Sequence, residues 1–238
     1  MEKISAVWDD LRVSRGMAVQ LAQRRARLDA GEKPLGWKLA FGAPAALERL
    51  GISGPLVGYL SDRAKLPSGT TLTAAEWTKP LVEPEIAIYL GKDLPGGGHR
   101  DAACAAIAAL GPALELADVD RPQLDIEETL CGNINQRNVI LGLRDESRAG
   151  GAVAGLVGRL RRNGAEVAIT SDPEAMTGDL IGLVRHVADL LGAFGETLRS
   201  GQIIIAGSIM PPVWIEAGEE VIFTLDPIDA ISVRMGTS

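Results

Sequence analysis

Residues 82–90 read Val-Glu-Pro-Glu-Ile-Ala-Ile-Tyr-Leu, and a glycine follows them. The β-branched content of this stretch and the glycine at its end predict a strand. Side chains alternate between the two faces of a strand, so Glu83 and Glu85 share one face. Two anions on one face of an otherwise buried strand are unfavourable unless a cation lies beside them. A divalent cation, which prefers hard oxygen ligands, would satisfy both.

A second apolar run, residues 112–118, carries a third carboxylate, Glu115. Small alanines two residues away on either side share its face and leave room for a ligand. Three carboxylates suit an octahedral Mg²⁺ that keeps open positions for water or substrate. The sequence therefore predicts a metal site at Glu83, Glu85 and Glu115. The alternative is that Glu83 and Glu85 lie on a wet sheet face and that Glu115 pairs with an arginine.

Two further residues are candidates for proton transfer. Lys38 lies in the apolar stretch Gly-Trp-Lys-Leu-Ala-Phe, which has the pattern of a strand. An apolar setting favours the uncharged form of a lysine, which can take up a proton. The alternative is an ammonium group that pairs with an acid or extends to solvent. Asp62 follows a strand-like run at residues 56–60, a position where aspartate also commonly forms an Asx turn.

A glycine–serine pair before two prolines is the remaining candidate. Gly207 permits a close backbone approach, and exposed amides together with the Ser208 hydroxyl can hold a carboxylate. Pro211 and Pro212 would stiffen this segment. The same pattern is typical of a strand exit followed by a turn, so both interpretations stay open.

The composition favours an enzyme over a nucleic-acid or membrane protein. The chain has 238 residues, 46% of them hydrophobic, and a net charge of −7. An acidic balance argues against a general nucleic-acid or anionic-membrane surface, and no apolar run is long enough to span a bilayer. The N-terminus lacks the basic-then-apolar pattern of a signal peptide. With Cys104 and Cys131 interpreted as reduced thiols, we expect a cytoplasmic protein.

The sequence divides at residue 54. Residues 1–54 are expected to form a helical N-terminal segment packed on the body, because apolar positions recur there at helical spacing. Residues 55–238 are expected to form a β-rich catalytic body, a single functional unit with short strands between Gly and Pro turns. The alanine-rich run from His99 to Leu110 and the amphipathic run from Asp179 to Leu198 predict two helices within it.

The order of six short motifs resembles the fumarylacetoacetate hydrolase superfamily, and within it the branch of 2-keto-4-pentenoate hydratases and 4-oxalocrotonate decarboxylases. The motifs run through most of the chain: Gly36–Leu39, Gly58–Asp62, Val82–Ile86, Pro112–Leu116, Ile140–Gly142 and Ala206–Pro212. The Glu-x-Glu, the later lone Glu and the Gly-Ser-x-x-Pro-Pro in this order are specific. The resemblance implies an α+β fold, the family's twisted mixed β-roll covered by helices.

The resemblance also implies roles for the candidate residues. The three carboxylates would bind Mg²⁺, with Mn²⁺ as an alternative. Lys38 matches the lysine of a Gly-aromatic-Lys motif, and Asp62 matches an acidic position of the family, which makes both candidate catalytic residues. The loop at Gly207 and Ser208 would lie beside the carboxylate of the substrate.

The chain departs from the family in its polar segments. Gly42–Ala43 stands where the branch usually has Thr-Ser, and Gly132–Arg137 stands where it usually has Asp-Asn-Ala-Ser-Ser-Gly. Of that segment Asn133 is kept, while Arg137 adds a cation with bidentate carboxylate-binding geometry. We take Asn133 and Arg137 as candidate substrate-binding residues. The pattern favours kept chemistry with a changed substrate, one that carries another carboxylate.

We expect a divalent-metal-dependent lyase that acts on a small 2-oxo or 2-hydroxydienoic acid, first of all a hydratase of the 2-keto-4-pentenoate type. A metal that stabilises negative charge on the substrate serves decarboxylation equally, so a 4-oxalocrotonate-type decarboxylase is the alternative. Acylpyruvate hydrolysis ranks lower, because no histidine precedes His99 as a water-activating base. The last alternative is a catalytically weak 2-oxo-acid-binding subunit. We expect a homo-oligomer, with a partner enzyme of the same pathway as a further candidate.

Overall fold

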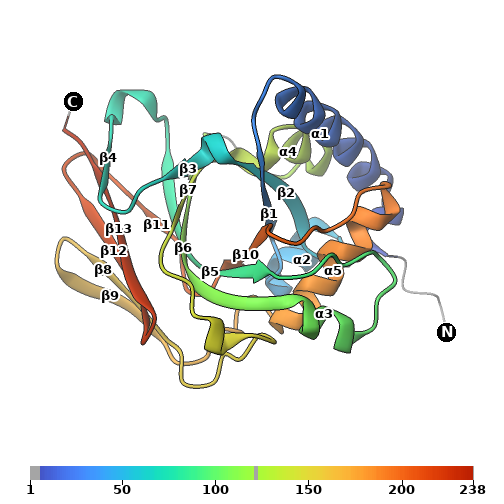
Figure 1. The fold of residues 1–238 in the computed structure, drawn as a ribbon. Helices are drawn as coiled ribbons and strands as arrows, with labels where there is room; N and C mark the ends of the chain where they lie inside the picture. The colour runs from blue at the N-terminus through green and yellow to red at the C-terminus, as the bar shows by residue number, and fades with distance from the viewer. Residues whose placement is uncertain (1–5, 121–122, 238) are drawn as a thin grey trace.

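The computed structural model describes residues 6–120 and 123–237. Figure 1 shows a curved sheet in the centre, a smaller sheet on one side of it and helices on the other. The helices are α1 (Leu11–Asp29), α2 (Pro44–Leu50), α3 (Arg100–Ala106), α4 (Ile126–Cys131) and α5 (Leu180–Ala193). The large sheet holds β1 (Pro34–Ala40), β2 (Leu56–Ser61), β3 (Lys65–Leu66), β5 (Pro80–Leu90), β6 (Ile107–Asp118), β7 (Gln136–Leu141), β10 (Ile203–Ser208) and β11 (Val213–Trp214). The small sheet holds β4 (Thr70–Leu72), β8 (Val157–Arg162), β9 (Ala165–Thr170), β12 (Glu220–Asp226) and β13 (Asp229–Met235).

The large sheet curls into a roll. Its strands follow the order β2-β1-β10-β5-β6-β7-β3, with β11 paired to β5. The two ends of this order, β2 and β3, are joined by a single 3₁₀ turn, Asp62–Ala64. Such a short link requires the two edges of the sheet to lie close together, which the curvature in Figure 1 provides. These mixed sheets and their helices confirm the expected α+β roll.

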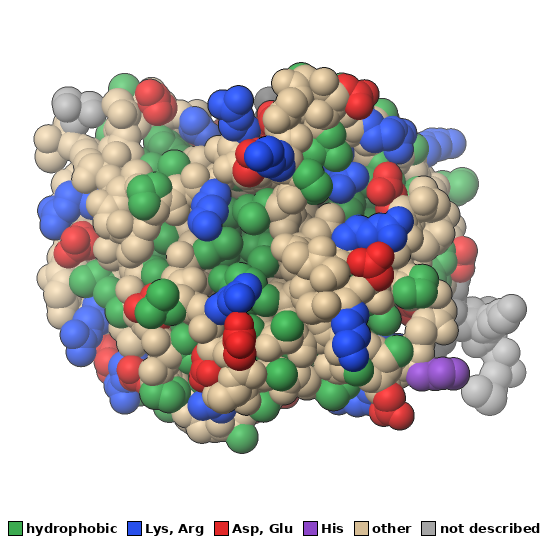
Figure 2. Space-filling model, in the orientation of Figure 1, with side chains coloured by type: hydrophobic (Ala, Val, Ile, Leu, Met, Phe, Trp, Pro, Cys, Tyr) green, Lys and Arg blue, Asp and Glu red, His purple; other side chains and the backbone are tan. Residues whose placement is uncertain are grey.

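The two faces of the roll have different partners. Ile86 and Leu114 point to the outer face, where they share a core with Phe223 and Val233 of the small sheet. The inner face carries a separate apolar cluster that includes Leu60, Ala87, Val139 and Ile205. In Figure 2 hydrophobic side chains gather in the hollow at the centre of the molecule, with Lys and Arg side chains around it. The interior of the roll therefore has a small packed core of its own, separate from the core shared with the small sheet.

Helices α1 and α4 pack together at one edge of the roll. Asp10 caps α1 by accepting from the Arg12 backbone N–H at 2.8 Å, as preferred at an N-cap. A methyl group added at Gly16 would lie 2.7 Å from Leu130 Cβ, so only glycine permits this close approach of α1 to α4. No helix in the described ranges is long and apolar enough to cross a membrane.

The first 54 residues supply more than helices. Besides α1 and α2 they contain β1, which lies inside the large sheet, parallel to β10 and antiparallel to β2. The helix expected at His99–Leu110 is wrong in its second half, because α3 ends at Ala106 and β6 begins at Ile107. Pairing with β5 from Leu90↔Ile107 onward overrides the helix propensity of the alanines.

Candidate metal centre

The register of β5 and β6 brings the three predicted carboxylates together. Glu83 lies directly opposite Glu115 in the antiparallel ladder, and Glu85 lies two residues along β5 on the same face. Carboxylate oxygens from all three residues lie within 4.8 Å of one another. Strand alternation explains why each side chain points inward, and the register explains why they converge.

Burial makes this cluster electrostatically unstable without a cation. Glu115 and Glu85 have exposed fractions of 0% and 1%, and Glu83 is partly buried. Burial, followed by repulsion from Glu115, raises the pKa of Glu83 to about 7. Burial also raises the pKa of Glu85 well above its usual range, and the other two carboxylates add to the effect. The pKa of Glu115 is raised by burial although the neighbouring Lys38 opposes the shift.

A free acceptor marks the place of a cation. Oε1 of Glu115 accepts a short hydrogen bond from Lys38, but Oε2 of Glu115 is buried and has no hydrogen-bond partner. A buried carboxylate oxygen is rarely left without a donor or a cation. The donor set consists only of carboxylate oxygens, which are the ligands of Mg²⁺ and Mn²⁺. These residues therefore fit a hard divalent cation.

Lys38 completes the cluster from the neighbouring part of the sheet. It lies on β1 opposite Gly58 and Ile205, with an exposed fraction of 1%. Its Nζ pairs with Glu115 and donates to the Ile134 carbonyl at 3.2 Å. A Cβ at position 58 would lie 2.9 Å from Lys38 Cγ, so the glycine makes room for the lysine stem. The lysine is thus buried, as its apolar stretch indicated, and it pairs with an acid, as in the alternative interpretation; its role in proton transfer stays a prediction.

Gly207 and Ser208, the last residues of β10, lie beside the same carboxylates. Gly207 has φ +88°, a left-handed conformation that favours glycine, and its N–H donates to Glu85 Oε2 at 2.8 Å. The Ser208 hydroxyl donates to the Met210 carbonyl at 2.7 Å. Both residues line a cavity that also reaches Lys38 and Glu83. The end of β10 thus orients a carboxylate of the cluster and also forms one wall of the cavity.

The cavity in front of the cluster is largely apolar. Its volume is about 430 Å³, within the usual range of a small-molecule site. Its apolar walls include Leu81, Ala117, Met176, Leu183 and Trp214. Arg49, on α2, lines this cavity too, and sequence reasoning missed it. A lone arginine on a short helix carries no sequence signal that separates it from a solvated surface residue.

Three sequence-predicted residues lie elsewhere. Asp62 is exposed at the end of β2, where its Oδ1 accepts from the Lys33 backbone N–H at 2.8 Å. The Asn133 side chain bridges the backbone of Tyr59, accepting from its N–H at 2.8 Å and donating to its carbonyl at 3.0 Å. Neither residue is among those that line the metal cavity. Asn133 therefore holds its turn against β2 through these two hydrogen bonds.

Arg137 also has structural partners. Its guanidinium lies 3.2 Å from Asp118, donates to the Glu76 carbonyl and stacks 4.1 Å from the Trp77 ring centroid. These contacts tie β7 to the end of β6 and to the turn before β5. Arg137 does not line the metal cavity.

Comparison with known proteins gives a consistent result. The family described as fumarylacetoacetate (FAA) hydrolase C-terminal matches residues 45–234. The chain is 27% identical over 221 residues to 2-hydroxyhexa-2,4-dienoate hydratase of Comamonas testosteroni, covering 91% of this chain and 83% of the relative. It is 24% identical over 237 residues to 4-oxalocrotonate decarboxylase of Pseudomonas putida, covering 98% and 89%. The solved 4-oxalocrotonate decarboxylase from Pseudomonas putida G7, complexed with magnesium and adipate, matches with a TM-score of 0.86 at 24% identity, covering 98% of this chain and 90% of that one.

The chain belongs to the fumarylacetoacetate hydrolase family. The relatives that it matches over most of its length are hydratases and decarboxylases, which makes the protein an enzyme of the lyase class. The resemblance inferred from the six motifs is thereby confirmed.

Proposed function

We propose that this protein is a Mg²⁺-dependent lyase that acts on a small 2-oxo or 2-hydroxydienoic acid, in the first place as a hydratase. The single observation that supports this most is the buried cluster of Glu83, Glu85 and Glu115, with a free oxygen on Glu115. The cluster opens on an apolar cavity of about 430 Å³, which suits a short conjugated acid.

The protein groups around the cluster have separate tasks. When bound, Mg²⁺ would supply Lewis-acid stabilisation of negative charge on the substrate oxygens. Lys38 Nζ is held by Glu115 and the Ile134 carbonyl, in reach of the cavity, where it can give a proton to a substrate carbon. Apolar side chains form most of the cavity wall beside that transfer. The Gly207 N–H fixes the orientation of Glu85.

A specific residue supports the second candidate, a decarboxylase of diacids. Arg49 lines the cavity, and within the described residues it makes no ion pair or hydrogen bond. An unpaired guanidinium at a pocket wall is suited to hold a second carboxylate in bidentate fashion. A substrate with carboxylates at both ends could thus meet the cluster with one end and Arg49 with the other. This role replaces the one that the sequence assigned to Arg137.

An ultraviolet screen separates these functions. Purified protein with Mg²⁺ is given 2-hydroxydienoates and oxalocrotonate-like diacids, and the products are identified. Hydration adds water and keeps every carbon, whereas decarboxylation releases carbon dioxide. Tight Mg²⁺-dependent binding of oxalate with no turnover of any of these acids would instead identify a binding subunit.

We also propose that the protein is a cytoplasmic homo-oligomer. Val167 and Ile169, on one face of the edge strand β9, have exposed fractions of 50% and 53%. An exposed apolar edge of this kind is suited to pairing with a second copy. Cys104 and Cys131 are both free, which suits a reducing compartment. Analytical ultracentrifugation tests the assembly, with Ile169→Lys as the variant that should weaken it.

A further inference from the structure

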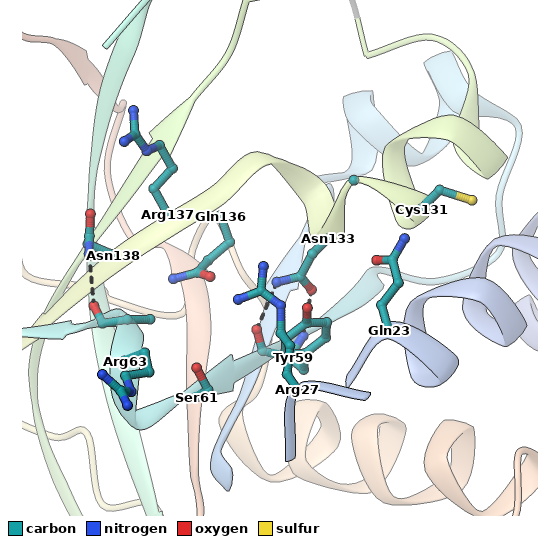
Figure 3. Close-up of a pocket in the computed structure, with 12 residues that line it drawn as sticks. Gln23, Arg27, Tyr59, Ser61, Arg63, Cys131, Asn133, Gln136, Arg137 and Asn138 are labelled. Atoms are coloured by element: carbon teal, nitrogen blue, oxygen red, sulfur yellow. Dashed lines mark hydrogen bonds between the residues drawn. The ribbon is translucent and has the colours of Figure 1, made fainter. Parts of the chain in front are cut away.

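A second cavity of about 460 Å³ lies on the opposite side of β2 from the metal centre. Leu60 belongs to the interior cluster of the roll, so its neighbours Tyr59 and Ser61 point to the outer face. They line this second cavity together with side chains from α1, α4 and the start of β7, as Figure 3 shows. The two cavities have no lining residue in common.

The walls of this cavity are cationic although the chain is acidic. Arg27, Arg63 and Arg137 line it, and no Asp or Glu is among its described lining residues. The chain as a whole has a net charge of −7. A concave positive surface on a negative protein concentrates anions locally.

Two of the donors in this cavity have no partner. Nε2 of Gln136 is buried without a hydrogen bond, and Arg63 forms no ion pair or hydrogen bond within the described part of the chain. Arg27 forms an ion pair with Glu32 at 3.5 Å, a distance too long for a good hydrogen bond. In Figure 3 the Gln136 amide and the Arg27 guanidinium face the same space above Ser61, while Arg137 extends away from it.

We propose that this cavity is a second, metal-independent binding site for a small oxyanion, either a dicarboxylate or inorganic phosphate. Arg27 and Arg63 supply the charge, while Gln136 Nε2 and the Ser61 hydroxyl supply neutral hydrogen bonds. Both ligand types offer several acceptor oxygens to this arrangement of donors, and arginine recognises both in bidentate geometry.

The site is joined to the metal centre by one turn. Asn133, Ile134 and Asn135 have φ values of 49°, 54° and 56°, a left-handed run that is unfavourable for non-glycine residues and most of all for Ile134. Asn133 lines the anion cavity, whereas the Ile134 carbonyl accepts from Lys38 Nζ. The turn thus connects the two sites, and we expect an anion bound on one side of it to change the position of Lys38 on the other side.

Binding is tested by calorimetry on the full-length protein with EDTA and then with Mg²⁺. Inorganic phosphate and succinate are titrated separately to distinguish the two sources of the oxyanion. Arg63→Gln should weaken binding of the probe that the wild type binds, phosphate or succinate, by about tenfold or more. Arg185→Gln is the control, because Arg185 is likewise exposed and unpaired within the described residues but lies on α5. Binding that survives Arg63→Gln unchanged, or that requires Mg²⁺, would overturn the proposal.

Two further measurements keep the test decisive. Gln136→Leu keeps the side-chain volume and removes the unpaired donor, so it should also weaken binding, with circular dichroism to verify folding. The coupling predicts that succinate shifts the Mg²⁺ affinity of the wild type, by reciprocal linkage, and that Arg63→Gln abolishes the shift. Succinate that bound at the metal centre itself would shift both proteins equally and would contradict the assignment.

Discussion

Lys38 donates to one oxygen of Glu115 and leaves the other oxygen of the same carboxylate without a partner. The lysine therefore pairs with only one of the three carboxylates. Burial is the main cause that raises the pKa of Glu83 and that of Glu85, and repulsion from the neighbouring carboxylates adds to it. A divalent cation would offset both effects.

Replacing Glu85 by alanine should abolish Mg²⁺ binding and leave the fold intact. Because burial and repulsion raise the pKa of the Glu85 carboxyl, its removal should raise the melting temperature of the metal-free protein at neutral pH. Calorimetric titration with Mg²⁺ and thermal unfolding in EDTA measure the two effects. Glu146→Ala is the control, as Glu146 is an exposed carboxylate paired with Arg144. An unchanged Mg²⁺ affinity would remove Glu85 from the metal site.

Mg²⁺ affinity should rise with pH between 6 and 8. The pKa of Glu83 is about 7, so below that value a proton competes with the cation for this carboxylate. For one competing proton the affinity falls by about tenfold per pH unit below the pKa. Glu83→Gln should bind Mg²⁺ more weakly, and its affinity should depend less on pH. A flat profile in the wild type would show that Glu83 does not have to deprotonate for binding.

The stability of the metal-free protein should have the opposite dependence. The pKa of Glu83 is about 7 in the folded state, above its ordinary value of 4.5. Between these two pH values the folded state therefore binds more protons than the unfolded state. Stability is then greatest at low pH and falls as the pH rises from about 4.5 to about 7. Urea unfolding in EDTA at several pH values measures this fall, which saturating Mg²⁺ should reduce. The Glu83→Gln variant is the control, because it keeps every other titratable group. If the wild type did not lose stability relative to this variant as the pH rises from about 4.5 to about 7, the prediction would be wrong.

Lys38→Met should lower kcat by about 10²–10⁴ while oxalate still binds with Mg²⁺, if the lysine transfers protons. Oxalate is the suitable probe, because it offers two oxygens but no carbon to protonate. If Lys38 only neutralises Glu115, the variant should lose oxalate affinity and keep more of its kcat. Lys65→Met, at an exposed position on β3, is the control. A Lys38 variant with wild-type kcat would exclude this residue from the chemistry.

Arg49 and Arg137 should respond differently to a diacid substrate. Arg49→Gln should raise KM for a diacid but not for a monoacid, since a contact of roughly 1.5–3 kcal/mol is lost with the diacid only. Arg137→Met should act on the two substrates equally and lower the melting temperature, because Arg137 joins Asp118, Glu76 and Trp77. If the preference for diacid over monoacid changed only in the Arg137 variant, Arg137 and not Arg49 would bind the second carboxylate, as the sequence predicted.

The predictable part of the site was the part set by strand alternation. Glu83, Glu85 and Glu115 sit inside apolar strands, so period-two patterning alone places them on one face. The position of Asn133 could not be predicted in this way. It lies in a left-handed turn and bonds to the Tyr59 backbone, a contact between residues far apart in the sequence. Arg49 was missed because its significance comes from α2 forming part of the wall of the metal cavity, which the sequence does not indicate. The short α3 was overestimated because pairing with β5 decides where β6 begins.

The parallel pairing of β1 with β10 sets the order in which the protein can mature during synthesis. Trp37 is made well before its strand partner Ile204, because more than 160 residues separate the two. Pairing across so large a sequence separation is slow and has to wait for the distant strand. The strand that carries Lys38 therefore lacks one of its two neighbours until β10 has been made. A nascent chain that stalls before β10 would contain the carboxylates of β5 and β6, but its lysine would not yet be held in place, so catalytic competence should appear only after β10 has paired.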